Sequence, residues 1–337
     1  MTAKLETTTP PAGQEYPWRH EQRPGRSRIT NAISAVFVAV LIVLPFLIDP
    51  IALRRTAGVI VLTLAVLGVV VATGYTGLIS LGHGAFVGVG AFAMGAYLDL
   101  VNLPFLLALP ATFATSWVIG WLFGLPALRI KGIYLALITL GLGVVFPSLA
   151  KRFPEITGGV TGRPIDSTME APAWLGADHT ITYRYFFCLA VCAVMFWMTW
   201  KILGSRMGRA MQAVRDDETS AAAFGVKLVT IKAGAFALSA ALAGMAGALQ
   251  AVLFPFVSHE QFNVFLSFRL YAAAVIGGAG FVIGAVYGVA ALIIVPALNS
   301  VVGLLDNDVL VFGVGLILFT FLSPNGIAGS VRRWERR

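Results

Sequence analysis

Long apolar segments, separated by short polar ones, run through almost the whole chain after Arg28. Ten can be drawn, at about 29–48, 56–73, 84–101, 105–125, 133–150, 184–203, 233–254, 264–279, 283–302 and 309–322. A helix needs about 20 residues to cross the hydrocarbon layer. The pattern therefore predicts an all-α, polytopic membrane protein with about ten transmembrane helices. The weakest boundary is Gly277-Gly278-Ala279-Gly280, which is typical of either a tight turn or a kink within one longer helix.

One polar interruption differs from the others. From Thr56 to Leu98 the chain has no Asp, Glu, Lys or Arg, yet glycines, hydroxyls and a histidine gather at 74–83 in the middle of this run. Backbone groups freed from a helix are costly in lipid, so such a segment survives only inside protein or along a watery cavity. We expect a broken or re-entrant segment near 74–83 that lines a solute pathway. The candidate pathway residues are Gly74, Thr76, Ser80, Gly82 and His83.

Two roles for His83 remain open. Its imidazole can donate a hydrogen bond to a carboxylate or carbonyl of the solute, or it can satisfy the carbonyls that a broken helix leaves free.

Composition supports the membrane assignment. Hydrophobic residues make up 58% of the chain and charged residues 12%, and the mean hydropathy is +0.84; soluble domains carry about twice that charge. The net charge of +8 does not indicate nucleic-acid binding, because the basic residues lie at the ends of the apolar segments. Cys188 and Cys192 share one apolar helix, so neither a disulfide framework nor a metal site is expected.

The distribution of Lys and Arg predicts the orientation. With the N-terminus inside, most of the 24 basic residues fall on the cytoplasmic side, as the positive-inside rule requires. Both termini are then cytoplasmic. The expected parts are a flexible cytoplasmic tail (1–28), a transmembrane domain (29–322) and a basic cytoplasmic tail (323–337). Within the domain, a long loop at 151–183 faces outward and another at 204–232 faces inward.

Several kinds of chemistry have no sequence signature here. The chain has no phosphate-binding Gly-x-x-x-x-Gly-Lys-Ser/Thr loop, no zinc motif and no nucleophile elbow. Ion-driven carriers usually keep carboxylates within the membrane, whereas Asp99 lies at the end of an apolar segment and no other Asp or Glu lies within one. We expect no enzymatic activity, no metal and no cofactor of its own. The driving force should come from a partner; a stand-alone channel or ion-coupled carrier is the alternative.

Four sequence blocks resemble a known family. The chain is similar to the LivM-type permease subunits of ATP-binding-cassette (ABC) importers for branched-chain amino acids. The blocks are Gly74-Tyr75-Thr76-Gly77 with Ser80-Leu81-Gly82-His83-Gly84-Ala85-Phe86; Leu128-Arg129-Ile130-Lys131-Gly132-Ile133-Tyr134 with Thr157-Gly158-Gly159; residues 208–218 with Gly225; and Val275-Ile276-Gly277-Gly278-Ala279-Gly280 with Pro324-Asn325-Gly326.

The resemblance implies a set of partners and a location. It implies a second, LivH-like permease subunit, two cytoplasmic ATPase subunits that bind the ATP, and a periplasmic solute-binding protein, in a bacterial inner (plasma) membrane. The solute it implies is a branched-chain or other hydrophobic amino acid. Amides, urea and aromatic or organic acids are the alternatives, because relatives of this family carry them.

The resemblance also gives the two long loops a role. Residues 208–225 look like the coupling helix that docks into the ATPase; Ala, Met and Arg favour one short amphipathic helix, and Gly225 is suited to end it. A helix that only binds lipid headgroups is the alternative. Thr157, Gly158 and Gly159 would form an outer gate or meet the binding protein. The residues expected at the ATPase are Arg209, Arg215, Asp216, Asp217, Glu218 and Gly225.

Three residues depart from the family pattern. Leu78 replaces a polar residue, and Arg163 stands where an apolar residue is usual. Arg269 lies within an apolar segment, and an intramembrane arginine is costly and marks function. Arg269 either extends to the outer interface or pairs with Glu260, or it contacts an anionic solute. We include Arg269 among the candidate pathway residues.

Overall fold

A computed structural model describes residues 39–125, 133–165, 169, 179–302, 313 and 326–335. The chain divides into two compact units, Met1–Val43 and Leu44–Arg337; in the first, residues 39–43 are helical. The tail 1–28, residues 29–38 of the expected segment 29–48, all of 309–322 except Gly313, and the motif residues 128–132 lie outside the described residues.

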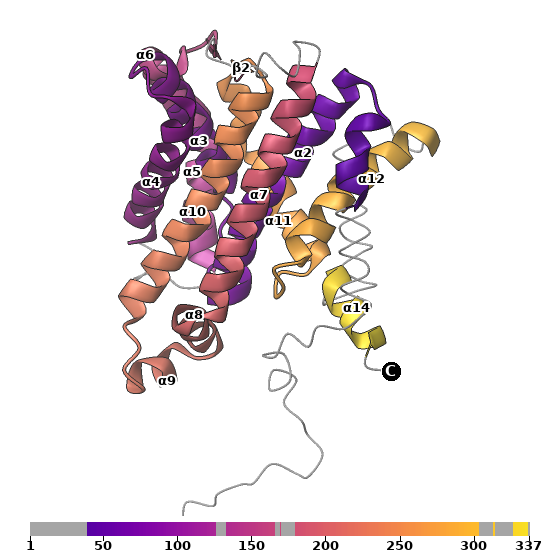
Figure 1. Cartoon of the computed structure of the whole chain (residues 1–337). Helices are drawn as coiled ribbons and strands as arrows, with labels where there is room; N and C mark the ends of the chain where they lie inside the picture. Colours follow the sequence, from indigo (N-terminus) through magenta and orange to yellow (C-terminus); the bar gives the residue numbers. More distant parts are fainter. Residues whose placement is uncertain are drawn as a thin grey trace, which may run out of the picture. The chain divides into compact units, whose positions relative to one another are not determined.

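In its described residues, the second unit is built from helices and one pair of very short strands (Figure 1). Its described elements are η1 (Leu44–Phe46), α2 (Pro50–Val69), η2 (Val70–Tyr75), α3 (His83–Asp99), α4 (Phe105–Gly124), α5 (Ile133–Arg152), α6 (Pro154–Thr157), β1 (Arg163–Pro164), α7 (Thr180–Gly204), α8 (Arg206–Asp216), α9 (Glu218–Ala223), α10 (Leu228–Leu253), β2 (Phe256–Val257), η6 (His259–Phe262), α11 (Val264–Gly277), α12 (Gly284–Val302) and α14 (Gly326–Glu335).

The fold class is confirmed. Five described helices are long and apolar enough to cross a membrane: Pro50–Tyr75, Phe105–Gly124, Tyr134–Arg152, Thr180–Gly204 and Leu228–Leu253. The apolar helix α11 and the segment Gly284–Ile293 of α12 are shorter. The number of ten spans stays a prediction.

The observed helix boundaries differ most from the expected ones where charged residues lie near the end of a helix. α2 begins at Pro50 rather than at residue 56, because the Asp49 carboxylate caps the Ala52 amide at 3.2 Å and Pro50 suits the first helical position. α10 begins at Leu228 rather than at residue 233 and so includes Lys232. At the uncertain boundary near 277–280 the structure has a turn: α11 ends at Gly277, and Gly278 has φ 104°.

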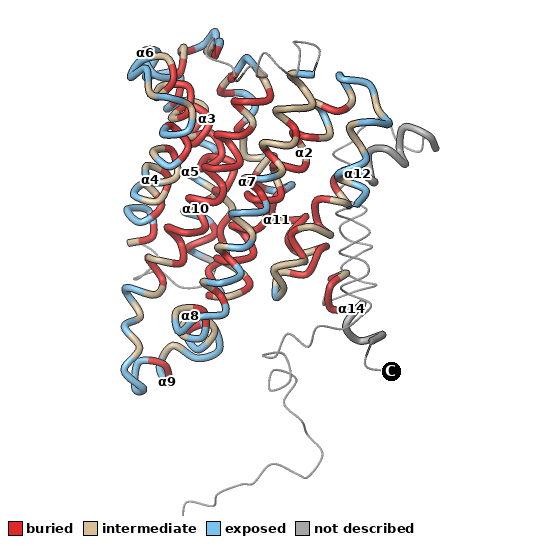
Figure 2. The backbone as a smooth tube through the Cα atoms, in the orientation of Figure 1, coloured by how far each residue is buried: buried red, intermediate tan, exposed pale blue. Residues whose placement is uncertain are grey.

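α10 is the central helix of the unit, and Figure 2 shows it buried along most of its length. α2, α3 and α4 pack around it through small residues, which let helix backbones approach closely. A Cβ added at Gly90 of α3 would collide with the Gly244 carbonyl of α10, and one at Gly247 with the Val87 carbonyl. The same holds for Gly120 of α4 against Ala240.

The two ends of the helical unit carry different loops (Figure 1). At one end β1 pairs antiparallel with β2, and α6 lies beside them. At the other end lie α8 and α9, and the end of η2 contacts the 278–283 turn at Gly74 and Ala279. Gly326, at the start of α14, packs on Gly278 of that turn. This second end therefore brings together the helix break, the α8–α9 loop and the start of α14.

Candidate functional site

The interruption expected near 74–83 is a real break in the helix. α2 widens into the π-helical η2, and just after its end the Leu78 amide donates back to the Ala72 carbonyl at 2.9 Å. Residues 77–82 are not helical, Gly77 has φ 70°, and α3 starts at His83. The Thr76 hydroxyl donates to the Ala72 carbonyl at 2.6 Å. Gly77 suits the left-handed conformation that ends the helix.

Protein surrounds the broken segment on several sides. Thr76, Ser80 and His83 are 3%, 1% and 1% exposed. The Leu81 amide donates to the Thr139 hydroxyl of α5 at 2.9 Å, and a Cβ at Gly82 would press on the Thr139 carbonyl. The candidate pathway residues of this segment therefore lie inside the subunit, and their contact with solute stays a prediction.

His83 ties the break to the central helix. Its Nε2 lies 2.6 Å from the Ser239 hydroxyl of α10, and that hydroxyl donates to the Gly68 carbonyl of α2 at 2.7 Å. Because the single hydroxyl proton of Ser239 points at Gly68, the Nε2 of His83 must carry the proton that it shares with Ser239. The histidine thus acts through Ser239 on a carbonyl within α2, and both roles considered for His83 stay predictions.

The Thr157-Gly158-Gly159 motif forms a compact turn at the end that carries β1 and β2. The Thr157 hydroxyl donates to the Ala150 carbonyl at 2.6 Å and accepts from the Gly159 amide at 3.1 Å. Gly158 and Gly159 have φ 76° and 64°. Glycines are required here because both residues adopt the left-handed conformation.

Arg163, one of the departures from the family pattern, holds this turn in place. Its Nε donates to the Asp99 carboxylate at 3.1 Å, and its Nη1 donates to the carbonyls of Glu155 and Ile156 at 3.1 and 3.0 Å. The ion pair is largely shielded from solvent. Arg163 therefore connects the end of α3 to α6, from which the turn follows.

The expectation of one amphipathic helix over 208–225 is wrong in one respect. The segment forms two helices, α8 and α9, because Asp217 is extended and its carboxylate caps the Ser220 amide at 2.6 Å. An Asp cap starts a new helix and thereby ends the previous one. Gly225 has φ 82° and follows the end of α9, as expected.

The charged residues of this loop contact the membrane helices. Arg215 donates through Nη1 to the Gly74 carbonyl of η2 at 2.8 Å, and through Nε and Nη2 to the Asp216 carboxylate at 3.0 Å each. Glu218 accepts from the Lys232 ammonium of α10 at 2.6 Å. Arg209 is exposed on α8. Of the charged residues expected at the ATPase, Arg215, Asp216 and Glu218 thus also have partners within the subunit.

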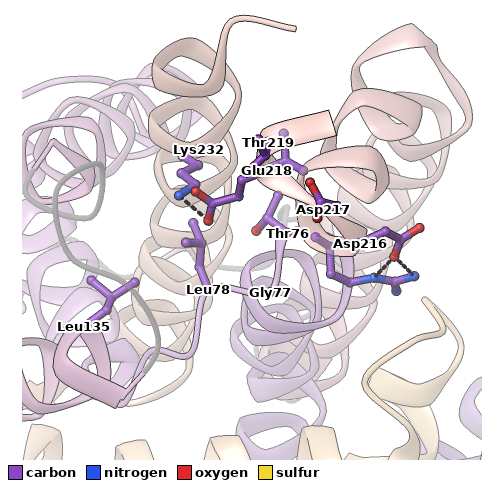
Figure 3. A pocket seen from close by; sticks show the side chains of 11 residues that line it. Thr76, Gly77, Leu78, Leu135, Asp216, Asp217, Glu218, Thr219 and Lys232 are labelled. Atoms are coloured by element: carbon purple, nitrogen blue, oxygen red, sulfur yellow. Dashed lines mark hydrogen bonds and ion pairs between the residues drawn. The ribbon is translucent and has the colours of Figure 1, made fainter. Parts of the chain in front are cut away.

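A cavity of about 280 Å³ lies between the Arg215 side chain and the Glu218–Lys232 pair. Figure 3 shows Thr76, Gly77 and Leu78, at the start of the break, on one wall, and Asp217, Glu218 and Thr219 of the α8–α9 loop opposite them, with the Lys232–Glu218 pair nearby. Sequence reasoning missed Lys232, because α10 was expected to begin after it. The cavity is lined by both segments for which the sequence indicates function, the helix break and the α8–α9 loop.

Two further side chains stand out at the surface. Phe224, just after α9, is 89% exposed, and sequence reasoning had not singled it out. Arg269 is exposed on α11, and the described residues give it no hydrogen bond or ion pair. The pairing of Arg269 with Glu260 is therefore not found in the structure.

Comparisons with known proteins identify the family. Residues 51–320 match the family model described as "Branched-chain amino acid transport system / permease component". The LivM permease protein of Escherichia coli K12 is 29% identical over 88% of this chain and 75% of its own length. A probable LivM of Methanocaldococcus jannaschii is 23% identical over 75% of this chain and 86% of its own, and LivH of Escherichia coli K12 is 31% identical over 48% of each.

No solved structure matches the chain. The family model covers most of the sequence and every described helix from α2 to α12. The protein therefore belongs to the family of permease components of branched-chain amino acid transport systems.

Proposed function

We propose that this chain is the membrane-spanning permease subunit of an ABC importer that moves branched-chain or other hydrophobic amino acids. The observation that carries the proposal is the contact between the α8–α9 loop and the helix break through Arg215 and Gly74. Chains of packed side chains and hydrogen bonds carry coupling between distant sites, and this contact supplies such a link between the loop and the end of η2. The relatives, whose names describe transport of branched-chain amino acids, support the choice of solute.

The proposal includes the partners that such a subunit needs. A LivH-like permease subunit would complete the membrane domain, and two ATPase subunits would bind ATP and dock on α8 and α9. Arg209 and Phe224 are exposed on this loop and suit such an interface, because arginine and aromatic side chains are enriched at protein contacts. A periplasmic binding protein would deliver the solute to the Thr157-Gly158-Gly159 turn. The subunit would lie in the bacterial inner membrane with the α8–α9 end in the cytoplasm.

Uptake by reconstituted vesicles tests this function. The complex of the chain with the permease, ATPase and binding-protein subunits encoded beside it is expected to accumulate leucine in an ATP-dependent, vanadate-sensitive way. Vesicles that contain this chain alone are expected to take up none, because the chain has no nucleotide site of its own. Full uptake by the chain alone would show a channel or carrier instead. Uptake of urea or an amide in preference to leucine would select the alternative solutes.

The pathway residues differ in their expected response to substitution. Arg269 is exposed and without an ionic partner in the described residues, so Arg269→Gln should leave thermal stability unchanged and lower uptake of a carboxylate solute roughly tenfold. His83 is buried against Ser239, so His83→Ala should lower stability by about 3 kcal/mol. The measurements are leucine uptake and thermal unfolding in detergent. Normal uptake by Arg269→Gln would remove Arg269 from the pathway.

A further inference from the structure

The carbonyl of Gly74 lies at a position where a helix loses its own hydrogen bonds. η2 ends at Tyr75, and the last carbonyls of a helix have no partner within it. The nearby amides are already engaged, since Gly77 donates to the Thr73 carbonyl and Leu78 to the Ala72 carbonyl. The donor that reaches Gly74 comes from another element, the Arg215 side chain of α8, at 2.8 Å. A cation at this end of a helix is also favoured by the helix dipole.

Arg215 contacts the break at a second point. A Cβ added at Gly77 would lie 3.3 Å from Cγ of Arg215, so the aliphatic part of the arginine packs on the first residue of the non-helical segment. The Asp216 carboxylate accepts from Nε and Nη2 and thereby fixes the plane of the guanidinium. The arginine is thus held in one orientation while it spans the end of η2 and the start of the break.

The other side of the same loop is attached to a different helix. Glu218, the first residue of α9, accepts from Lys232 of α10 at 2.6 Å, and the lysine side chain is only 3% exposed. The two attachments flank Asp217, the extended residue between α8 and α9. A displacement of the α8–α9 junction relative to η2 and α10 would therefore act on both the Arg215–Gly74 hydrogen bond and the Glu218–Lys232 ion pair.

We propose that Arg215 is a positioning residue that makes the helix break at 77–82 follow the movement of α8. The guanidinium holds the end of η2, and the cavity between the break and α9 gives Leu78 room to move. This inference rests on the proposed function, since it supplies the step between the ATPase and the pathway. It assigns Arg215 a partner inside the membrane subunit in place of a carboxylate on the ATPase.

The test uses the complete reconstituted complex and a cysteine probe at the break. Leu78→Cys lines the cavity, and Cys188→Ala and Cys192→Ala remove the native thiols. In this background, labelling of the probe by a small thiol reagent is expected to differ between the nucleotide-free and vanadate-trapped states. Arg215→Met keeps the aliphatic stem and removes the donor. It should retain the ATPase subunits and ATP hydrolysis, lower leucine uptake roughly tenfold or more, and abolish the difference in labelling.

Two further variants sharpen the result. Arg215→Lys retains a cationic donor and should restore part of the uptake and of the labelling difference. This variant keeps the test decisive if Arg215→Met fails to assemble. Arg55→Met is the matched control, since Arg55 is an exposed arginine near the start of α2, at the opposite end of the unit from α8; uptake and labelling should be unchanged.

The outcomes separate this inference from the proposed function. If the unsubstituted complex shows no ATP-dependent uptake, the proposed function fails. If it does, and Arg215→Met keeps either normal uptake or the nucleotide-dependent labelling, the positioning role is overturned. Selective loss of the ATPase subunits from both Arg215 variants would place Arg215 at the ATPase interface and would equally overturn it.

Discussion

Gly90→Ala is expected to abolish recovery of the folded subunit from detergent extracts. The added Cβ would overlap the carbonyl of Gly244, where α3 crosses the central helix α10. Both backbones are buried at this crossing, and α2 and α4 support α10 from other sides. Neither helix can retreat without loss of its remaining contacts, so we expect a destabilisation of more than about 3 kcal/mol. The measurement is the monodisperse fraction in size-exclusion chromatography, followed by thermal unfolding.

The matched control for this prediction is Gly141→Ala. Gly141 lies within α5 and is exposed, and a Cβ there would meet nothing within 4 Å. Alanine favours a helix more than glycine does, so this variant should be as stable as the parent protein or slightly more stable. Equal yields of the two variants would show that α3 and α10 are not in close contact in the folded subunit.

Glu218→Ala should lower the stability of the subunit by about 3 kcal/mol, because it leaves the buried ammonium of Lys232 without the carboxylate 2.6 Å away. Lys232→Met should cost less. Methionine occupies much of the space of the aliphatic part of Lys232. The Glu218 side chain, which would lose its partner, is 26% exposed and reaches water. Because the cost of Glu218→Ala comes from the buried charge, the double variant should be more stable than Glu218→Ala alone. The unfolding midpoint can be followed by the reaction of a fluorogenic dye with Cys188 and Cys192, which are buried in the folded subunit.

Glu260→Ala serves as a control for the loss of an acidic side chain, because Glu260 is exposed in η6. Its effect should stay within about 0.5 kcal/mol. A double variant less stable than either single variant would contradict the assignment of the effect to an uncompensated buried charge. The cycle would also show how firmly the α8–α9 loop is attached to α10 before any partner binds.

The amino-acid sequence alone predicted the membrane fold and the main interruption in it. Long apolar segments require helices in lipid, because backbone polar groups must be satisfied within the segment. The glycines and hydroxyls of 74–83 predicted a break, which the structure has at 77–82. Apolarity did not locate the ends of α2 and α10, since a helix continues past Arg54, Arg55 and Lys232 when a cap or an ion pair accommodates the charge.

The tertiary structure decided which polar groups meet. Gly74 and Arg215 are far apart in the sequence, as are His83 and Ser239, and hydropathy carries no information about such pairs. The sequence marked both the break and the inward loop as functional, but their contact became visible only in the folded subunit. The pattern of apolar residues indicates where single helices lie, whereas hydrogen bonds between distant segments depend on how the helices pack around α10.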